Sequence, residues 1–316
     1  MKMMSLRKPP AVAAGSAISI VAPASPAKMD RVENGQAMLR GLGYSPALGV
    51  NALERQPLYF AGTPEQRLGD LHAAFADTET SAIMALRGGY GSNYLLDNLD
   101  LDAIASNPKP FFAYSDLTGL QLHLLDVVGL PAFHGPMLAA DFYREDGVHL
   151  ESFRAAVAGE PYSVGAAEGL RILKPGRVPG NVTGTLYGGC LSIIVAMLGT
   201  PWEPCTEGTL LFLEDLATKP YQVDRLLWQL RNTRKLEGVR GIIFGEMYEC
   251  VSPGAPLDLL DKAILSALDG FSGPIAIGLR SGHVSRENVT LTFGVEAELE
   301  LDGEIRLNML EPAVTV

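Results

Sequence analysis

Residues that commonly bind metals are few in this sequence of 316 residues. It has 5 histidines and no His-Glu-x-x-His motif, the arrangement that places two zinc ligands on one face of a helix. The 3 cysteines, Cys190, Cys205 and Cys250, are odd in number and lack the paired spacing of a zinc site. We therefore expect no metal, no cofactor, and reduced thiols of the kind found in the cytosol.

Positive charge is also scarce, because 25 Lys and Arg residues stand against 36 Asp and Glu residues and give a formal net charge of −11. An acidic surface of this kind disfavours nucleic acid and anionic lipid as main partners. No apolar run in the sequence reaches the length of about 20 residues that a membrane-spanning helix needs. We expect neither nucleic acid nor a membrane as a partner.

The amino terminus has features of a secretory signal, since basic residues such as Lys2 precede an apolar run that ends near Ala27. Against a signal, Pro9 and Pro10 interrupt the transition from basic to apolar residues. Residues 17–21 also have the character of a buried first strand, which cleavage after Ala27 would remove. We expect no signal peptide and a cytoplasmic location.

Short apolar runs alternate with helical stripes through the first half of the chain. This alternation predicts an N-terminal α/β domain over residues 1–159, built on a parallel sheet that helices cover on both faces. Residues 160–180 are rich in Pro and Gly and are predicted to be a linker. Residues 181–316 are predicted to form a mixed α/β domain with antiparallel strands, since Asp302-Gly303 separates two alternating runs as a hairpin turn does. A length of 316 residues also favours two domains.

Two segments in the first domain have the pattern of a buried strand, a tight turn and a helix. They are residues 82–98 and residues 111–128, and each places polar groups at the carboxyl end of its strand, where open α/β sheets bind ligands. Gly88 and Gly89 in the first turn leave backbone N–H groups free to face a ligand. Ser115, at the second junction, is placed as a nucleophile would be, although a serine before a helix is more often an N-cap.

A serine nucleophile needs a base to take its proton and an acid to orient that base. His134 and His283 each lie in a glycine-containing loop at a strand end, and the residues alone do not decide between them. Glu214 and Asp215 end an apolar strand, so alternation directs them to opposite faces and only one can serve a shared cleft. The alternative is that both merely cap the next turn.

An oxyanion would be stabilised by backbone N–H groups at the two turns. Asp116 is expected to supply one, because the residue after a nucleophile at such a junction directs its N–H into the cleft. Gly89 is the candidate for the second donor, and the Asp116 side chain is expected to cap its own helix. Arg87 could bind a free carboxylate through two parallel hydrogen bonds, or pair with an acid of the fold.

Several motifs occur in one order along the chain. They are Leu86-Arg87-Gly88-Gly89-Tyr90-Gly91, Tyr114-Ser115-Asp116, Phe133-His134-Gly135-Pro136-Met137, Leu213-Glu214-Asp215, Gly282-His283 and Asn288-Val289-Thr290-Leu291. In this combination the sequence resembles the LD-carboxypeptidase family of serine peptidases, which includes murein tetrapeptide carboxypeptidases and microcin-immunity peptidases. The resemblance covers nearly the whole chain.

The resemblance implies a catalytic triad of Ser115, Glu214 and His283, with the site at the domain interface, and leaves His134 in a structural turn. Arg87 and Gly88 are then expected to contact the substrate. Asp116, His134, Glu214 and His283 could instead gather around zinc, although their spacing is not that of a metal site.

The activity implied is that of a serine carboxypeptidase that cleaves the L,D bond and releases the terminal D-alanine of murein tetrapeptide during cell-wall recycling. A homodimer is expected. One alternative is an immunity-type peptidase that hydrolyses peptidyl or aminoacyl nucleotides; it ranks second because residues 145–180 hold only Phe153 and Tyr162 as aromatics. The other is a two-domain protein that binds a ligand without catalysis. Cys190 stands where relatives tend to have asparagine, and its role is open.

Overall fold

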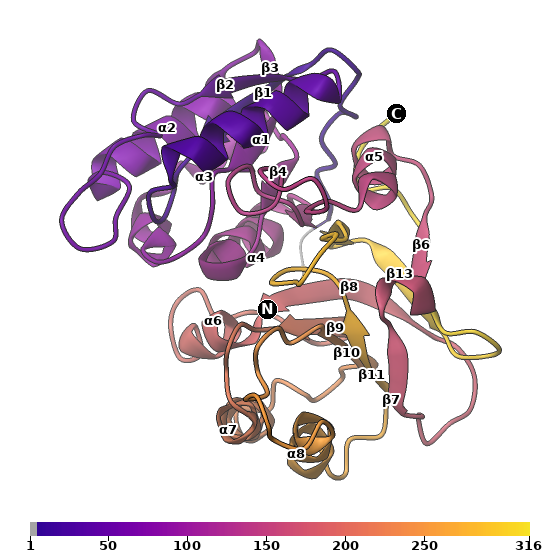
Figure 1. The fold of residues 1–316 in the computed structure, drawn as a ribbon. Helices are drawn as coiled ribbons and strands as arrows, with labels where there is room; N and C mark the ends of the chain where they lie inside the picture. The colour runs from indigo at the N-terminus through magenta and orange to yellow at the C-terminus, as the bar shows by residue number, and fades with distance from the viewer. Residues whose placement is uncertain (1–4) are drawn as a thin grey trace.

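The computed structural model describes residues 5–316; Lys2 of the possible signal lies outside them. The chain forms two halves, each built on its own β-sheet (Figure 1). The N-terminal half lies above the C-terminal half in this view, and the carboxyl end of the chain returns to the upper half beside α5 (Leu150–Ala158). Both halves therefore contain residues from distant parts of the sequence.

The first sheet has six strands in the order β12-β5-β4-β3-β1-β2. All pair in parallel except β12, which pairs antiparallel with β5. The strands are β1 (Ala17–Val21), β2 (Ser45–Leu48), β3 (Thr80–Ala85), β4 (Phe111–Ala113), β5 (Ala132–His134) and β12 (Leu291–Phe293). The connecting helices include α1 (Met29–Gly41), α2 (Pro64–Ala76), the 3₁₀ helix η1 (Ser92–Asn98), α3 (Leu101–Ser106), the 3₁₀ turn η2 (Ser115–Leu117) and α4 (Thr118–Val128).

The second sheet has eight strands in the order β6-β14-β13-β8-β9-β10-β11-β7. Its centre is parallel and its flanks are antiparallel. The strands are β6 (Ser163–Gly165), β7 (Arg171–Lys174), β8 (Val182–Cys190), β9 (Thr209–Glu214), β10 (Gly241–Gly245), β11 (Ile275–Leu279), β13 (Glu296–Glu300) and β14 (Arg306–Met309). Helices α6 (Leu191–Ala196), α7 (Pro220–Asn232) and α8 (Leu259–Ala267), and the 3₁₀ turn η3 (Ala166–Glu168), complete this half.

The predicted fold class is confirmed: one half carries a mostly parallel sheet, and the other carries a mixed sheet with antiparallel strands. The prediction that residues 160–180 are a linker is wrong, because β6 and β7 lie within this range and form the two edges of the second sheet. Proline and glycine are compatible with short edge strands, which need fewer ladder hydrogen bonds than central ones. The hairpin at Asp302-Gly303 is confirmed by antiparallel pairing of β13 and β14.

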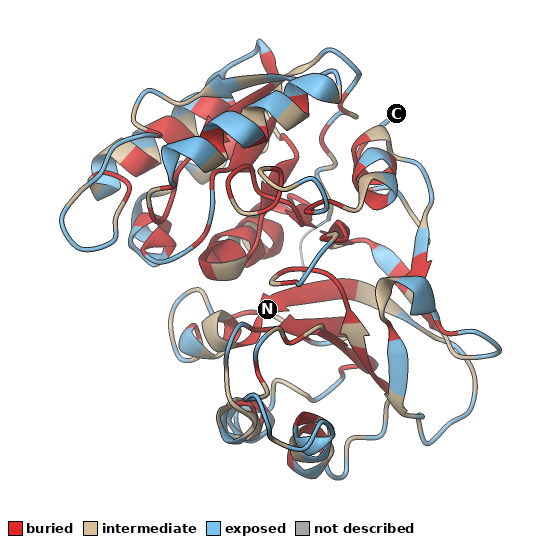
Figure 2. Ribbon diagram, viewed as in Figure 1, coloured by how far each residue is buried: buried red, intermediate tan, exposed pale blue. Residues whose placement is uncertain are grey.

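Helix α4 lies where the two halves meet. Its side chains are buried on nearly every face, so it is mostly red in Figure 2, with tan only where residues are half-buried, whereas α1 is exposed on its outer face. Leu120 and Leu124 of α4 pack in the core of the first half, while Leu122 and Leu125 pack in the core of the second. A helix that is apolar on all sides is expected where two layers enclose it. Its N-terminus, which follows Ser115 through the short turn η2, is thereby fixed at the seam.

Among residues 5–316, no helix combines the length and the apolar character needed to cross a membrane.

Candidate active site

Ser115 lies in a strained turn between β4 and α4. Its φ is +66°, in the left-handed region that a residue with a side chain rarely adopts. Strain of this kind costs on the order of 1–3 kcal/mol and is found at functional sites. Tyr114 before it is extended, and the 3₁₀ turn η2 begins at Ser115 itself, so Ser115 does not cap a helix as a standard N-cap would.

Gly88 packs directly against Ser115. A Cβ at Gly88 would lie 2.7 Å from Ser115 Cβ, 2.9 Å from Ser115 Oγ and 3.3 Å from the backbone nitrogen of Asp116. Any side chain at this position would displace the serine. The two turns that the sequence singled out therefore meet, and Gly88 is a glycine because of this close approach.

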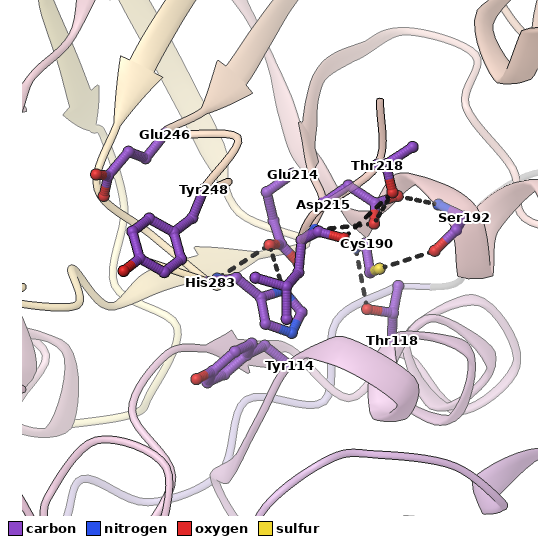
Figure 3. Close-up of polar contacts among 12 residues, drawn as sticks. Tyr114, Thr118, Cys190, Ser192, Glu214, Asp215, Thr218, Glu246, Tyr248 and His283 are labelled. Atoms are coloured by element: carbon purple, nitrogen blue, oxygen red, sulfur yellow. Dashed lines mark hydrogen bonds and ion pairs between the residues drawn. The ribbon is translucent and has the colours of Figure 1, made fainter. Parts of the chain in front are cut away.

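Glu214 and His283 form a hydrogen-bonded pair from different elements of the second half (Figure 3). Glu214 ends β9 and is fully buried. Its Oε2 lies 2.8 Å from His283 Nδ1 and accepts the His283 backbone N–H at 3.0 Å. Gly282, with φ +88°, lies against this carboxyl group, since a Cβ there would be 2.6 Å from Glu214 Cδ. The carboxylate thus fixes the position of the imidazole and directs its Nε2 away from Glu214.

Each member of this pair shifts the pKa of the other. Burial acts to raise the pKa of Glu214, but the charge and hydrogen bonds of His283 outweigh it and the net pKa is lowered. Burial acts to lower the pKa of His283, but the charge and hydrogen bond of Glu214, with smaller contributions from Asp215 and Asp141, raise it above its ordinary value. The geometry therefore favours an imidazole that can accept a proton and hold the resulting charge.

Asp215 points away from this pair, as strand alternation predicts. Its carboxylate accepts hydrogen bonds from the N–H of Ser192 and of Leu216, both at 2.9 Å, and from Thr218 Oγ1 at 2.8 Å. These are local caps for the turns that follow β8 and β9. The two adjacent acids, Glu214 and Asp215, therefore have different roles.

His134 lies at the end of β5, paired in register with Ala113 of β4. Its ring is completely buried and packs against the rings of Tyr114, Phe212 and Phe293. Neither ring nitrogen has a hydrogen-bond partner among the described residues. Burial lowers the pKa of His134 to about 4. These surroundings keep it neutral and apart from any proton acceptor.

The side chain of Asp116 does not cap its own helix, contrary to expectation. Its Oδ2 accepts the N–H of Ser92 at 2.9 Å, and its carbonyl oxygen accepts from Ser92 Oγ at 2.7 Å. The start of η1 is thereby tied to the turn after Ser115. The Asp116 backbone nitrogen remains beside Gly88 and Ser115.

Arg87 and Gly89 are exposed at the same turn. Gly89 has φ +115°, and a Cβ there would collide with Ser25 Oγ. Arg87 Nε donates to the carbonyl oxygen of Gly88 at 3.3 Å, and no ion pair joins Arg87 to an acid among residues 5–316. The guanidinium is therefore available to an anionic ligand.

Cys190 is buried at the end of β8, in register with Glu214. Its N–H donates to Thr118 Oγ1 at 3.1 Å, and its thiol lies 3.3 Å from Ser192 Oγ. Burial raises the pKa of the Cys190 thiol well above its ordinary value. The group is a protonated thiol at neutral pH, which does not favour a nucleophilic role.

Sequence reasoning missed Asp141, which lies in the loop after β5. Its carboxylate accepts hydrogen bonds from Tyr114 and from Asn288, two residues of the quoted motifs. No spacing or pattern in the sequence marks Asp141, because its partners are 27 and 147 residues away. Within residues 5–316, no group of three or more His, Cys, Asp or Glu side chains is arranged to hold a metal ion.

The sequence matches family models over most of its length. Residues 18–135 match the LD-carboxypeptidase N-terminal domain, and residues 183–299 match the LD-carboxypeptidase C-terminal domain. The chain belongs to the LD-carboxypeptidase family. It is a serine-type peptidase, in agreement with the strained serine and the acid–imidazole pair.

Curated relatives and solved structures of this family align with nearly the whole chain. A probable murein peptide carboxypeptidase of Bacillus subtilis is 34% identical, over 92% of this chain and 91% of its own. The crystal structure of a muramoyltetrapeptide carboxypeptidase from Oxalobacter formigenes is 29% identical, with a TM-score of 0.82 over 95% of this chain and 100% of that one. A structure of MccF in complex with glutamyl sulfamoyl guanosine is 26% identical, with a TM-score of 0.86 over 98% and 99% of the two chains.

Proposed function

We propose that this LD-carboxypeptidase removes the terminal D-alanine from murein tetrapeptide in the cytoplasm, as a step of cell-wall recycling, and acts as a homodimer. The observation that carries the proposal is the buried hydrogen bond between Glu214 and His283. The strained Ser115 supports it, since the neighbouring Tyr114 ring packs against the His283 ring. The muramoyltetrapeptide and murein peptide carboxypeptidases to which the chain is similar support the choice of substrate.

In this mechanism Ser115 Oγ attacks the carbonyl carbon of the bond that joins the last D-residue to the L-centre before it. His283 Nε2 takes the hydroxyl proton, and Glu214 holds the imidazole through Nδ1 and stabilises the imidazolium that forms. The carbonyl oxygen becomes an oxyanion, for which the N–H groups of Gly89 and Asp116 are the proposed donors. Both donors belong to the two turns that meet at Gly88.

Collapse of the tetrahedral intermediate breaks the C–N bond, and His283 gives its proton to the leaving amine of D-alanine. A water molecule then attacks the acyl-enzyme with the same imidazole as base, which frees the tripeptide and restores Ser115. The raised pKa of His283 suits this double role, because the imidazole must accept and return a proton near neutral pH.

Selection for a free carboxyl terminus is assigned to Arg87, with Gly88 shaping the same side of the site. A guanidinium can bind a carboxylate through two parallel hydrogen bonds, and Arg87 has no ion pair among residues 5–316 that would compete. This assignment explains how cleavage would be limited to the last residue. An amidated tetrapeptide, which lacks the terminal charge, should be a poor substrate.

The immunity-type alternative requires aromatic groups that stack on a nucleotide base. In the segment from residue 145 to residue 180, Phe153 is fully buried among core rings, and the Tyr162 hydroxyl donates to the carbonyl oxygen of Thr290 at 2.9 Å. Neither ring is presented for stacking. We therefore rank hydrolysis of aminoacyl nucleotides second, although MccF has the same fold.

The test is to incubate the protein with tri-, tetra- and pentapeptide murein fragments and to follow their masses. The expected result is loss of one alanine from the tetrapeptide, with no change in the tripeptide. An aminoacyl sulfamoyl nucleotide in a parallel reaction tests the alternative. A protein that hydrolyses only the nucleotide conjugate would overturn the proposed substrate.

Trapping with a serine-directed fluorophosphonate identifies the nucleophile. We expect the label on Ser115 and no label on a folded Ser115→Ala variant, whose turnover should be lower by about 10⁴-fold or more. Circular dichroism establishes that the variant is folded. Wild-type turnover by a folded Ser115→Ala protein would rule out this chemistry.

A further inference from the structure

A buried carboxylate outside the proposed triad lies between the turn that carries Ser115 and the turn that carries His283. Asp141 is in the loop after β5, and only 2% of its surface is exposed. Its Oδ1 accepts from Tyr114 Oη at 3.3 Å and from Asn288 Nδ2 at 3.2 Å, and its Oδ2 accepts the N–H of Met137 at 2.9 Å. Three donors from three segments therefore converge on one side chain.

On one side, this carboxylate holds the nucleophile turn. Tyr114 is the residue before Ser115, it is 5% exposed, and its hydroxyl reaches Asp141. Its ring packs against the His283 ring in a T-shaped arrangement, with centroids 5.2 Å apart and planes at 82° (Figure 3). A shift of Tyr114 would therefore disturb both the strained backbone of Ser115 and the packing against the His283 ring.

On the other side, the carboxylate holds the turn that carries the base. Asn288 is fully buried, and its amide pairs with the backbone of Gly282: Oδ1 accepts the Gly282 N–H at 3.0 Å, and Nδ2 donates to the Gly282 carbonyl oxygen at 3.0 Å. The second hydrogen of Nδ2 goes to Asp141. This donor orientation is fixed, because an amide that accepted at Asp141 could not make both bonds to Gly282.

We infer that Asp141 is a positioning residue, which acts through Tyr114 and Asn288 to hold the Ser115 turn and the His283 turn in one fixed geometry. The inference rests on the proposed roles of Ser115 and His283. Asp141 comes from the loop after β5 and Asn288 from the segment before β12, so the link joins parts of the chain that the triad itself does not connect. Errors of about 1 Å in such positions can lower turnover by about 100-fold.

The charge of Asp141 also acts on the base. The carboxylates of Glu214, Asp215 and Asp141 raise the pKa of His283. The positive charge of His283 in turn acts to lower the pKa of the neighbouring His134. Burial raises the pKa of Asp141 itself to about 6, and Arg144 and the three donors oppose that rise. At neutral pH the carboxylate is therefore ionised and stabilises the imidazolium.

The test is Asp141→Asn in the full-length chain. We expect kcat for D-alanine release to fall by about 10- to 100-fold, with a much smaller change in KM. The acid limb of the kcat/KM profile should move to lower pH, because loss of the Asp141 charge lowers the pKa of His283. A uniform loss of activity with an unmoved acid limb would show a merely structural role and would overturn the inference.

The matched control is Asp70→Asn. Asp70 is another buried carboxylate, 6% exposed, and it accepts the Asn51 N–H at 2.9 Å and Asn51 Nδ2 at 2.8 Å. Both hydrogen bonds of Asp70 go to Asn51 and neither involves Ser115, Glu214 or His283, so its loss should reduce thermal stability without moving the acid limb. An equal shift of the limb in both variants would contradict a specific role for Asp141.

Tyr114→Phe tests the nucleophile side separately, and it remains informative if Asp141→Asn does not fold. It removes one hydrogen bond and keeps both the ring and the Asp141 charge, so kcat should fall severalfold while the His283 pKa stays unchanged. Unchanged kcat in Tyr114→Phe would overturn the nucleophile side of the inference.

An NMR titration of the His283 ring needs no substrate and separates this inference from the proposed function. A wild-type protein that is inert towards all murein peptides would reject the function. A His283 pKa that is the same in Asp141→Asn and wild type would reject the influence of Asp141 on the base, whatever the substrate is.

Discussion

The turns that carry His283 and His134 offer a direct comparison, since both histidines neighbour a glycine and both lie at the seam of the two halves. His283 has a carboxylate 2.8 Å from Nδ1, and its side chain is 17% exposed. His134 is surrounded by aromatic rings, is fully buried and has no hydrogen-bond partner among the described residues. The pKa of His283 is raised above its ordinary value, and the pKa of His134 is lowered to about 4.

The difference shows that the surroundings, and not the residue type or its position in a loop, decide what a histidine can do. A base must have access to a proton and must be stabilised when it becomes charged. Glu214 is hydrogen-bonded to His283 and stabilises its charged form, whereas the ring nitrogens of His134 have no such partner among the described residues. The imidazole of His134, which aromatic rings surround, is instead a packed side chain of the hydrophobic core.

Removing each histidine should give the largest contrast. His283→Ala should lower kcat by about 10⁴-fold or more, because Ser115 then has no base. His134→Ala should keep measurable turnover and lose stability through the cavity it leaves. D-alanine release and thermal unfolding, measured on both variants, distinguish the two roles. Equal losses of activity in two folded variants would break the comparison.

Glu214→Gln should have the next largest effect. Loss of the carboxylate removes the charge that stabilises the imidazolium, so kcat should fall by about 10³- to 10⁴-fold. Glu214 raises the pKa of His283, and the base must be neutral to act, so kcat/KM of the wild type falls as pH decreases through that raised pKa. In the variant the pKa is lower, so the acid limb should move to lower pH.

The control for Glu214→Gln is Asp215→Asn, which removes the neighbouring carboxylate that caps the turns at Ser192 and Leu216. Its main effect should be on thermal stability, with a much smaller loss of kcat. A pH–rate profile of each variant provides the measurement. The assignment of Glu214 fails if Asp215→Asn is the more damaging change.

His134→Phe should produce a smaller effect, seen in the pH dependence of stability. The unfolded chain protonates this histidine near its ordinary value of 6.5, whereas the folded protein does so only near 4. The contribution of neutral His134 to the free energy of unfolding is therefore fully present above about pH 6.5. On the order of 3 kcal/mol of it is lost as pH falls towards 4. Phenylalanine keeps the ring packing and cannot titrate.

Urea unfolding of wild type and His134→Phe at pH 7 and pH 4.5 measures this difference. Asp141 and Asp126, whose folded pKa values are raised to about 6, contribute with the opposite sign in both proteins and cancel in the comparison. The same loss of stability in both proteins on acidification would contradict the buried, neutral state of His134.

Chelation should have the smallest effect. If both histidines were ligands of one zinc ion with Asp116 and Glu214, treatment with EDTA would abolish activity and zinc would restore it. We expect unchanged kcat after exhaustive chelation, because hydrogen bonding to His283 occupies Glu214 and aromatic rings enclose His134. Loss on chelation with recovery on adding zinc would replace the serine mechanism.

Local patterns in the sequence were sufficient for much of the fold. The helix starting at Pro64 forms where Thr63 and Gln66 make a capping box, and the Asp302-Gly303 turn joins two antiparallel strands as predicted. These features depend on neighbours within a few residues. Edge strands β6 and β7 were missed, because a short strand next to Pro and Gly has no distinctive pattern until another strand pairs with it.

For the site, patterns in the sequence identified the candidate groups: a serine at a strand-to-helix junction, two adjacent acids after an apolar strand, and two histidines in glycine-containing loops. Alternation also required Glu214 and Asp215 to face opposite sides. Three further features are visible only in the folded chain: Glu214 faces His283, aromatic rings enclose His134, and Asp141 bridges Tyr114 and Asn288. Those outcomes depend on contacts between residues from 20 to 159 positions apart, the shortest between Tyr114 and His134 and the longest between His134 and Phe293. Such contacts arise from the packing of two sheets around α4, which no local pattern encodes.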